Sequence, residues 1–185
     1  MTRSQRRRER AFTLMELMVV VVIAGVLSTL AVYGVRKYIY TAKTSEALHM
    51  LNSIAAAEES YKDETGRYLS ASSGPNSYYP QTNLIPGKSK WAWPNPGHAD
   101  AANWALLSVT SHEPVQFGYV AVAGGAGDAV PNLGTREDFT AVATPGRWFA
   151  LKAAADQNGD GKFSYFVLMR GEGISSGVHI EDEVE

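Results

Sequence analysis

One uncharged segment near the N-terminus constrains this chain more than any other feature. Residues 17–35 are apolar or small throughout, and positions 19–23 are all β-branched. Nineteen residues in an α-helix extend about 28 Å, close to the thickness of the hydrocarbon core of a bilayer. Five arginines and one glutamate precede the segment within the first ten residues, a charge bias typical of a cytoplasmic end. The segment is therefore expected to be a helix that enters a membrane.

A single carboxylate, Glu16, stands at the start of this apolar segment. Such a charge is costly in lipid, so it calls for a partner or a function. The surrounding residues read Ala11-Phe12-Thr13-Leu14-Met15-Glu16. This arrangement resembles the class III signal of type IV pilins and of the pseudopilins of type II secretion. In that family a small residue precedes Phe, Thr-Leu-x-Glu and a long apolar helix, and Ala11 stands where most members have Gly.

The resemblance implies a processing site and an assembly site. A prepilin peptidase would cut between Ala11 and Phe12 and methylate the new amino terminus. In a filament, the Glu16 carboxylate would pair with the freed amino group of Phe12 in a neighbouring subunit, which compensates two charges in an apolar core. Two alternatives remain open. Glu16 could cap its own helix or pair with its own amine, and the segment could be a plain signal anchor, which accounts for everything except Glu16.

Charge and composition exclude several classes of function. The net charge is −2, but the leader contributes +4, so the rest of the chain is near −6 and nucleic acid is not an expected partner. The chain has no cysteine. Disulfides, thiol catalysis, iron–sulfur clusters and cysteine zinc sites are therefore excluded.

Periodicity predicts an α+β fold with one long helix. The helix is expected over residues 12–65, with an amphipathic second half and Gly66 as its stop. A loop over 67–114, with a short helix at 100–107, leads to antiparallel strands at 115–122, 148–154, 162–169 and 177–180. The sheet should pack on the second half of the helix, as in the pilin ladle fold. The expected segments are a leader (1–11), a membrane or filament-core helix (12–35), an amphipathic helix (36–66), a loop (67–114) and a sheet region (115–185).

Residues 156–164 match the first half of a calcium loop. Oxygen ligands would come from the carboxylates of Asp156 and Asp160, the side-chain amide of Asn158, the backbone carbonyl of Lys162 and the hydroxyl of Ser164. The bidentate acid that completes such loops falls at Val167. An Asn-Gly-Asp-Gly run between strands is also a good turn without metal. The metal-free turn is the favoured interpretation, and calcium is the alternative.

The other candidate sites have weaker support in the sequence. The four histidines show no metal-binding spacing, and no nucleophile-elbow motif supports a serine–histidine–acid triad. The basic and aromatic cluster at 88–93 could stack on a sugar or on single-stranded DNA, but packing of its tryptophans onto the sheet is favoured. No enzymatic activity is expected.

These observations predict a structural subunit, minor or atypical, of a type IV pilus-like filament. Its partners would be other pilin subunits, the prepilin peptidase and an inner-membrane assembly platform. It would reside in the bacterial inner membrane and then in a cell-surface or periplasm-spanning filament. The alternatives are a pseudopilin of a type II secretion system and, from another class, a membrane-anchored calcium-dependent binding module.

Overall fold

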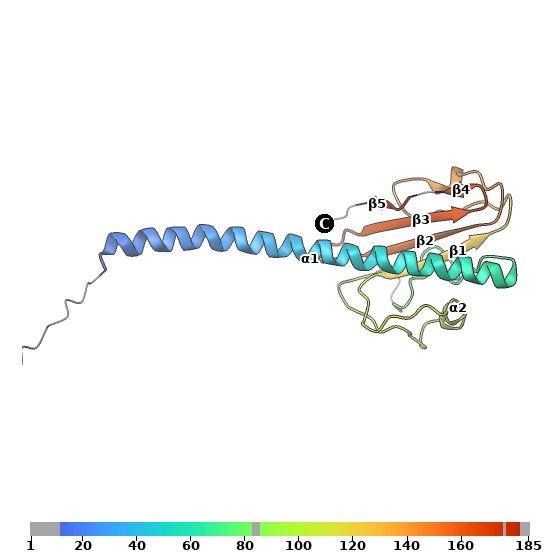
Figure 1. Cartoon of the computed structure of the whole chain (residues 1–185), viewed down its shortest axis with the longest axis horizontal. Helices are drawn as coiled ribbons and strands as arrows, with labels where there is room; N and C mark the ends of the chain where they lie inside the picture. The colour runs from blue at the N-terminus through green and yellow to red at the C-terminus, as the bar shows by residue number, and fades with distance from the viewer. Residues whose placement is uncertain (1–11, 83–85, 176, 182–185) are drawn as a thin grey trace, which may run out of the picture. The chain divides into compact units, whose positions relative to one another are not determined.

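The computed structural model describes residues 12–82, 86–175 and 177–181. Two helices, a short 3₁₀ helix and five strands follow one another along the chain (Figure 1). In order they are α1 (Leu14–Thr65), α2 (Ala101–Leu106), β1 (Gly118–Gly124), η1 (Phe139–Ala141), β2 (Trp148–Ala155), β3 (Ser164–Gly171), β4 (Ile174–Ser175) and β5 (His179–Glu181). The boundary between two compact units falls within α1, between Ile39 and Tyr40.

The long predicted helix is confirmed, and both of its ends have a local cause. At the start, the Glu16 N–H donates to Thr13 Oγ1 at 3.2 Å, and the Thr13 N–H donates to Glu16 Oε2 at 3.0 Å. This reciprocal pair is a capping box, which satisfies two amides that the first turn leaves open. At the other end, Gly66 has φ +76° and its N–H donates to the Lys62 carbonyl at 2.7 Å. A left-handed residue of this kind ends a helix, and glycine adopts it without strain.

Strands β1, β2 and β3 form the body of an antiparallel sheet in the order β1-β2-β3-β4, with β5 also paired to β3. Three predicted strands and the predicted edge strand are thus present. The first begins later than predicted because Val115 forms an isolated bridge with Trp91 and only Gly118 starts the continuous ladder. Strand β4, which has two residues, was not predicted, since so short a pairing leaves no period in the sequence.

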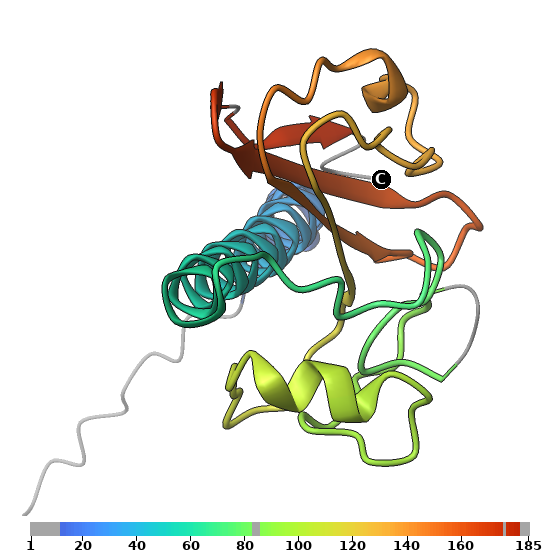
Figure 2. The same cartoon turned by 90° about the vertical axis from the view of Figure 1, so that its right-hand side faces the viewer.

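The second half of α1 packs on one face of the sheet, as predicted (Figure 2). The core there joins helix residues to aromatic and aliphatic residues of the strands and of the segment just before β1, among them Leu51, Ile54, Ala55, Phe117, Tyr119, Phe149, Leu151 and Phe166. The opposite face is buried as well, under the segment between β1 and β2, with Val130, Leu133 and Phe139 covering Val120, Trp148 and Val167. Every residue of β2 is consequently buried.

The loop before β1 is ordered by its own aromatic residues. The rings of Tyr79 and Trp104, the latter on α2, stack with centroids 5.1 Å apart, and Trp93 meets Tyr79 edge-on at 4.7 Å. The Trp93 Nε1–H donates to the Val109 carbonyl at 2.7 Å. Trp93 therefore belongs to the core, in agreement with the packing interpretation of the basic and aromatic cluster.

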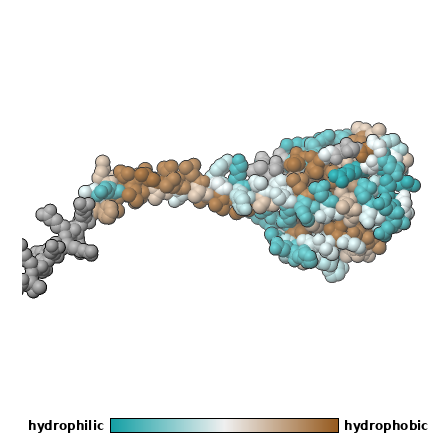
Figure 3. Space-filling view, viewed as in Figure 1, coloured by the Kyte–Doolittle hydropathy of each residue, from teal (hydrophilic) through white to brown (hydrophobic). Residues whose placement is uncertain are grey.

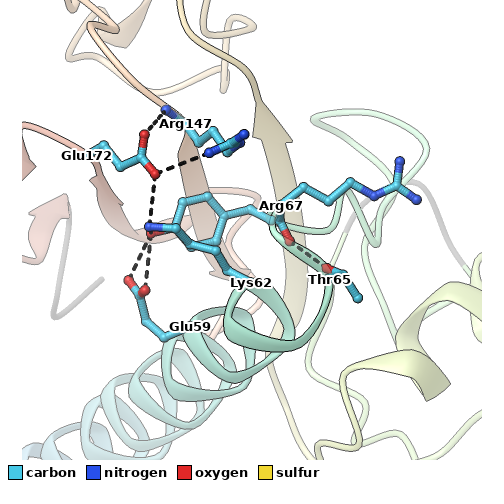
Figure 4. A network of polar contacts seen from close by, with 7 residues as sticks. Glu59, Lys62, Thr65, Arg67, Arg147 and Glu172 are labelled. Carbon is cyan, nitrogen blue, oxygen red and sulfur yellow. Dashed lines mark hydrogen bonds and ion pairs between the residues drawn. The ribbon is translucent and has the colours of Figure 1, made fainter.

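A polar network holds the last turn of α1 to the sheet (Figure 4). Lys62 Nζ lies 3.2 Å from Glu172 Oε1, and Arg147 at the start of the β2 region lies 3.5 Å from the same atom. Lys62 also donates to the Tyr68 hydroxyl, which donates to Glu59. The ion-paired groups are partly exposed to solvent, which screens their charges, so the network positions the helix more than it stabilises the fold.

Candidate functional site: the N-terminal assembly segment

The predicted processing site lies at the edge of the described chain. Ala11 falls outside the described residues, while Phe12 is the first residue within them and is 76 % exposed. Phe12 and Thr13 precede the helix and have no regular secondary structure.

Glu16 is held by Thr13 at the first turn of α1. Its Oε2 accepts from the Thr13 N–H and from the Thr13 hydroxyl, both at 3.0 Å. The carboxylate thus caps its own helix within this chain, which is one of the alternatives left open above. Among the described residues both contacts use Oε2, so Oε1 can still accept from a donor on another molecule. The role of Thr13 was missed at the sequence level, although the Thr-x-x-Glu spacing is the sequence signature of a capping box.

The first half of α1 exposes apolar side chains over its whole surface. Every residue from 12 to 39 is exposed, including Leu14 at 83 % and Val21 at 68 %. On the face that Figure 3 shows, the middle of this stretch is mostly hydrophobic, with hydrophilic residues near its start and towards its end. Among the described residues, α1 is the one helix long and apolar enough to cross a membrane. Such a surface is stable only in lipid or against other apolar helices.

The predicted calcium loop is a turn that satisfies its own backbone. Asp156 Oδ1 accepts from the Gly159 N–H, and Oδ2 accepts from the Gly161 N–H at 3.1 Å. Asn158 Oδ1 accepts from the Asp160 N–H, and Asp160 Oδ1 from the Lys162 N–H, at 2.9 and 2.8 Å. These are Asx-type turn contacts, which need no metal.

The residues around the loop add further hydrogen bonds and positive charge. Ser164 is buried at the start of β3, where its hydroxyl accepts from Gln157 Nε2 at 3.3 Å. Lys43 Nζ donates to the Gln157 carbonyl at 3.2 Å, and the Lys88 side chain lies against Gly159. Burial, with the charges of Lys88 and Lys90, lowers the pKa of Lys43. The four predicted side-chain ligands thus have hydrogen-bond partners within the chain, and two lysines bring positive charge to the loop, so the metal-free turn stays the favoured prediction.

The histidines form neither a metal site nor a triad in the described part of the chain. No cluster of three His, Asp or Glu side chains suited to a metal is present among residues 12–82, 86–175 and 177–181. Ser77, His98 and Asp100 do lie together, but Ser77 Oγ donates directly to Asp100 Oδ2 at 2.6 Å. His98 Nδ1 accepts from the Asp100 N–H at 3.0 Å. His98 Nδ1 is therefore occupied by the backbone, and no hydrogen bond joins the imidazole to Ser77 in the described structure, unlike the nucleophile–base pair of a triad.

Comparison with known proteins bears on the N-terminal segment. The profile of the prokaryotic N-terminal methylation motif matches residues 6–32. The chain carries a pilin-type N-terminus. It is 37 % identical over 87 residues to type II secretion system core protein G of Pseudomonas aeruginosa, which covers 47 % of this chain and 61 % of that protein. It is 41 % identical over 61 residues to type IV major pilin protein PilA of Myxococcus xanthus, which covers 33 % of this chain and 28 % of that protein.

These matches concern less than two thirds of either relative's length. No solved structure matches the chain significantly. The pilin-type N-terminus places Ala11, Phe12 and Glu16 within the matched motif. The α+β architecture, with an apolar helix whose second half packs on an antiparallel sheet, is consistent with the pilin fold.

Proposed function

We propose that this chain is a structural subunit of a type IV pilus-like filament, assembled through its N-terminal helix after a prepilin peptidase removes the leader. The observation that carries the proposal is the first half of α1, where a capping carboxylate precedes an apolar surface exposed on all sides. The missing cysteines, and the absence of proline before Pro75, favour a minor or atypical subunit. The role is structural and not enzymatic.

One helix with this surface serves two successive environments. In the inner membrane its apolar side chains face lipid tails, and in a filament the same side chains pack against helices of neighbouring subunits. The transfer between the two exchanges one apolar contact for another, so it costs little hydrophobic free energy. The chain can therefore be stored in the membrane and drawn into a filament at the cell surface.

Glu16 supplies the specificity that apolar packing lacks. Its Oε1 accepts a hydrogen bond from the freed amino group of Phe12 in the adjacent subunit, while Oε2 keeps its hydrogen bonds to Thr13. Each charge alone would be stranded in the apolar core of a filament, whereas the pair compensates both. Because Glu16 lies four residues after Phe12, this pairing fixes the axial register of neighbouring helices.

A second candidate function is a pseudopilin of a type II secretion system. The observation that favours it is the longer match to core protein G, which reaches beyond the N-terminal helix. Filament assembly by the N-terminal helix is common to both candidates. They differ in whether the filament emerges from the cell or spans the periplasm.

Immunogold labelling of sheared surface filaments, with antibody against the sheet region, tests the proposal. Label along the filaments supports the pilus subunit. Unlabelled surfaces, together with loss of protein secretion when the gene is deleted, support the pseudopilin. Absence of both effects, with the chain confined to the inner membrane, contradicts an assembly role.

A further inference from the structure

A polar pocket opens in the loop before β1, away from the N-terminal segment. Its volume is about 230 Å³, and its lining includes Asn76, Ser77, Gln81, Thr82, His98 and Ala99. Drug-sized ligands occupy pockets of about 300–1,000 Å³, so this one suits a single small ring. Apart from the imidazole of His98, its lining carries no ionisable side chain except the phenol of Tyr78. The described walls therefore offer no fixed charge for an ionic ligand.

Asp100 sets the hydrogen-bonding direction of two lining groups. Because the Ser77 hydroxyl donates its proton to Asp100 Oδ2 at 2.6 Å, its oxygen is left to accept. Because His98 Nδ1 accepts from the Asp100 N–H at 3.0 Å, the ring proton resides on Nε2, which is left to donate. The buried carboxylate also takes the Ser73 N–H and hydroxyl, so it is fixed in place.

Gln81 and Asn76 add two amide groups whose orientation is likewise fixed. Gln81 is 1 % exposed and its Nε2 donates to the Gln116 carbonyl at 2.7 Å, while its Oε1 is buried without a partner in the described structure. Asn76 Oδ1 lies 3.4 Å from Nζ of the buried Lys152, which is itself anchored on the Leu133 carbonyl at 2.6 Å. The Asn76 Nδ2 donors are thereby directed away from the lysine.

We propose that this pocket binds one neutral sugar residue. A pyranose hydroxyl is both donor and acceptor, and it matches walls that present Ser77 as an acceptor and His98 and Asn76 as donors. A site built to hydrogen-bond hydroxyls rejects analogues that lack them, because its polar groups are then left unpaired. The pocket lies wholly within residues 76–99, so the inference is independent of whether the chain assembles into a filament.

Saturation-transfer NMR on the full chain in micelles of a phosphocholine detergent tests the proposal. The probes are the methyl glycosides of glucose, galactose, mannose and N-acetylglucosamine, with glucuronic acid as the charged comparison. A sugar-free detergent is needed because a maltoside would compete. We expect transfer to at least one neutral glycoside, with a Kd on the order of millimolar, and at least tenfold weaker binding of glucuronic acid.

Two variants localise the binding. Ala99→Trp fills the pocket from an exposed position, and Ala102→Trp places the same ring on an exposed position of α2 that does not line the pocket. The first should abolish transfer and the second should leave it unchanged. Asn76→Ala should weaken binding at least fivefold. No transfer to any neutral glycoside, transfer that survives Ala99→Trp, or equal binding of glucuronic acid would each overturn the proposal.

Discussion

Glu58 offers the sharpest test of the packing between α1 and the sheet. Its side chain is fully buried, Oε2 accepts from the Leu69 N–H at 2.9 Å, and Oε1 has no partner in the described structure. Burial raises the pKa of Glu58 from 4.5 to about 7, the Leu69 hydrogen bond opposes this, and the charge of Glu59 adds to it. The carboxyl group therefore holds its proton more tightly in the folded state than in the unfolded state.

The sign of the pH dependence follows from this difference. The contribution of Glu58 to stability is fully present below pH 4.5 and is lost as the pH rises through about 7. Raising a pKa from 4.5 to about 7 corresponds to a loss of about 3 kcal/mol between those limits. Glu58→Gln removes the titration and keeps an oxygen for the Leu69 N–H. The free energy of unfolding of this variant should exceed that of the wild type at pH 8.

Urea unfolding followed by tryptophan fluorescence, from pH 4.5 to pH 8, measures this effect. A soluble fragment beginning at Arg36 is suitable because both core clusters lie between Ala47 and Val178. The matched control is Glu64→Gln, an exposed glutamate of the same helix, which should follow the wild type. If Glu58→Gln also follows the wild type across this range, the buried carboxyl group does not titrate as argued and the reasoning fails.

Three further predictions concern processing, assembly and metal binding. Ala11→Trp should leave a precursor in the inner membrane that still carries its leader, because the peptidase requires a small residue before Phe12; a mature product in immunoblots would contradict this. Glu16→Leu should insert normally but reduce the chain recovered in sheared filaments about tenfold or more, since the neighbouring amino group loses its counter-charge. If the Glu16→Leu chain is recovered in filaments as fully as the control variant Ser28→Leu, Glu16 has no assembly role. The melting temperature of the soluble fragment should be the same with calcium and with chelator, both for the wild type and for the double variant Asp156→Ala, Asp160→Ala. A melting temperature that calcium raises in the wild type alone would establish a metal site.

The sequence predicted the parts of the fold whose signals are local and periodic. The apolar run and the three- and four-residue spacing that follows it defined α1 to within two residues at each end. Aromatic and β-branched enrichment located β2 and β3, because each strand alone carries enough of that pattern. Trp93 of the 88–93 segment was also correctly assigned to packing, because it lies in the core.

Long-range packing accounts for what the sequence did not show. The burial of Lys152 depends on a carbonyl nineteen residues earlier, at Leu133, and on the segment that covers the second face of the sheet. Because all residues of β2 are buried, the strand has no alternation of apolar and polar residues that would indicate the burial of Lys152. The pocket at Asn76 likewise depends on Asp100, which is distant in sequence. The capping role of Thr13, by contrast, could have been found from its spacing to Glu16.

Mass spectrometry of the chain's N-terminal peptide, recovered from sheared and purified filaments, tests the central claim most directly. The account predicts a chain that begins at Phe12 and carries one methyl group on its α-amino nitrogen. Filaments that lack this chain, or a chain in them that retains its arginine-rich leader, would contradict the claim that processing after Ala11 releases the helix for assembly.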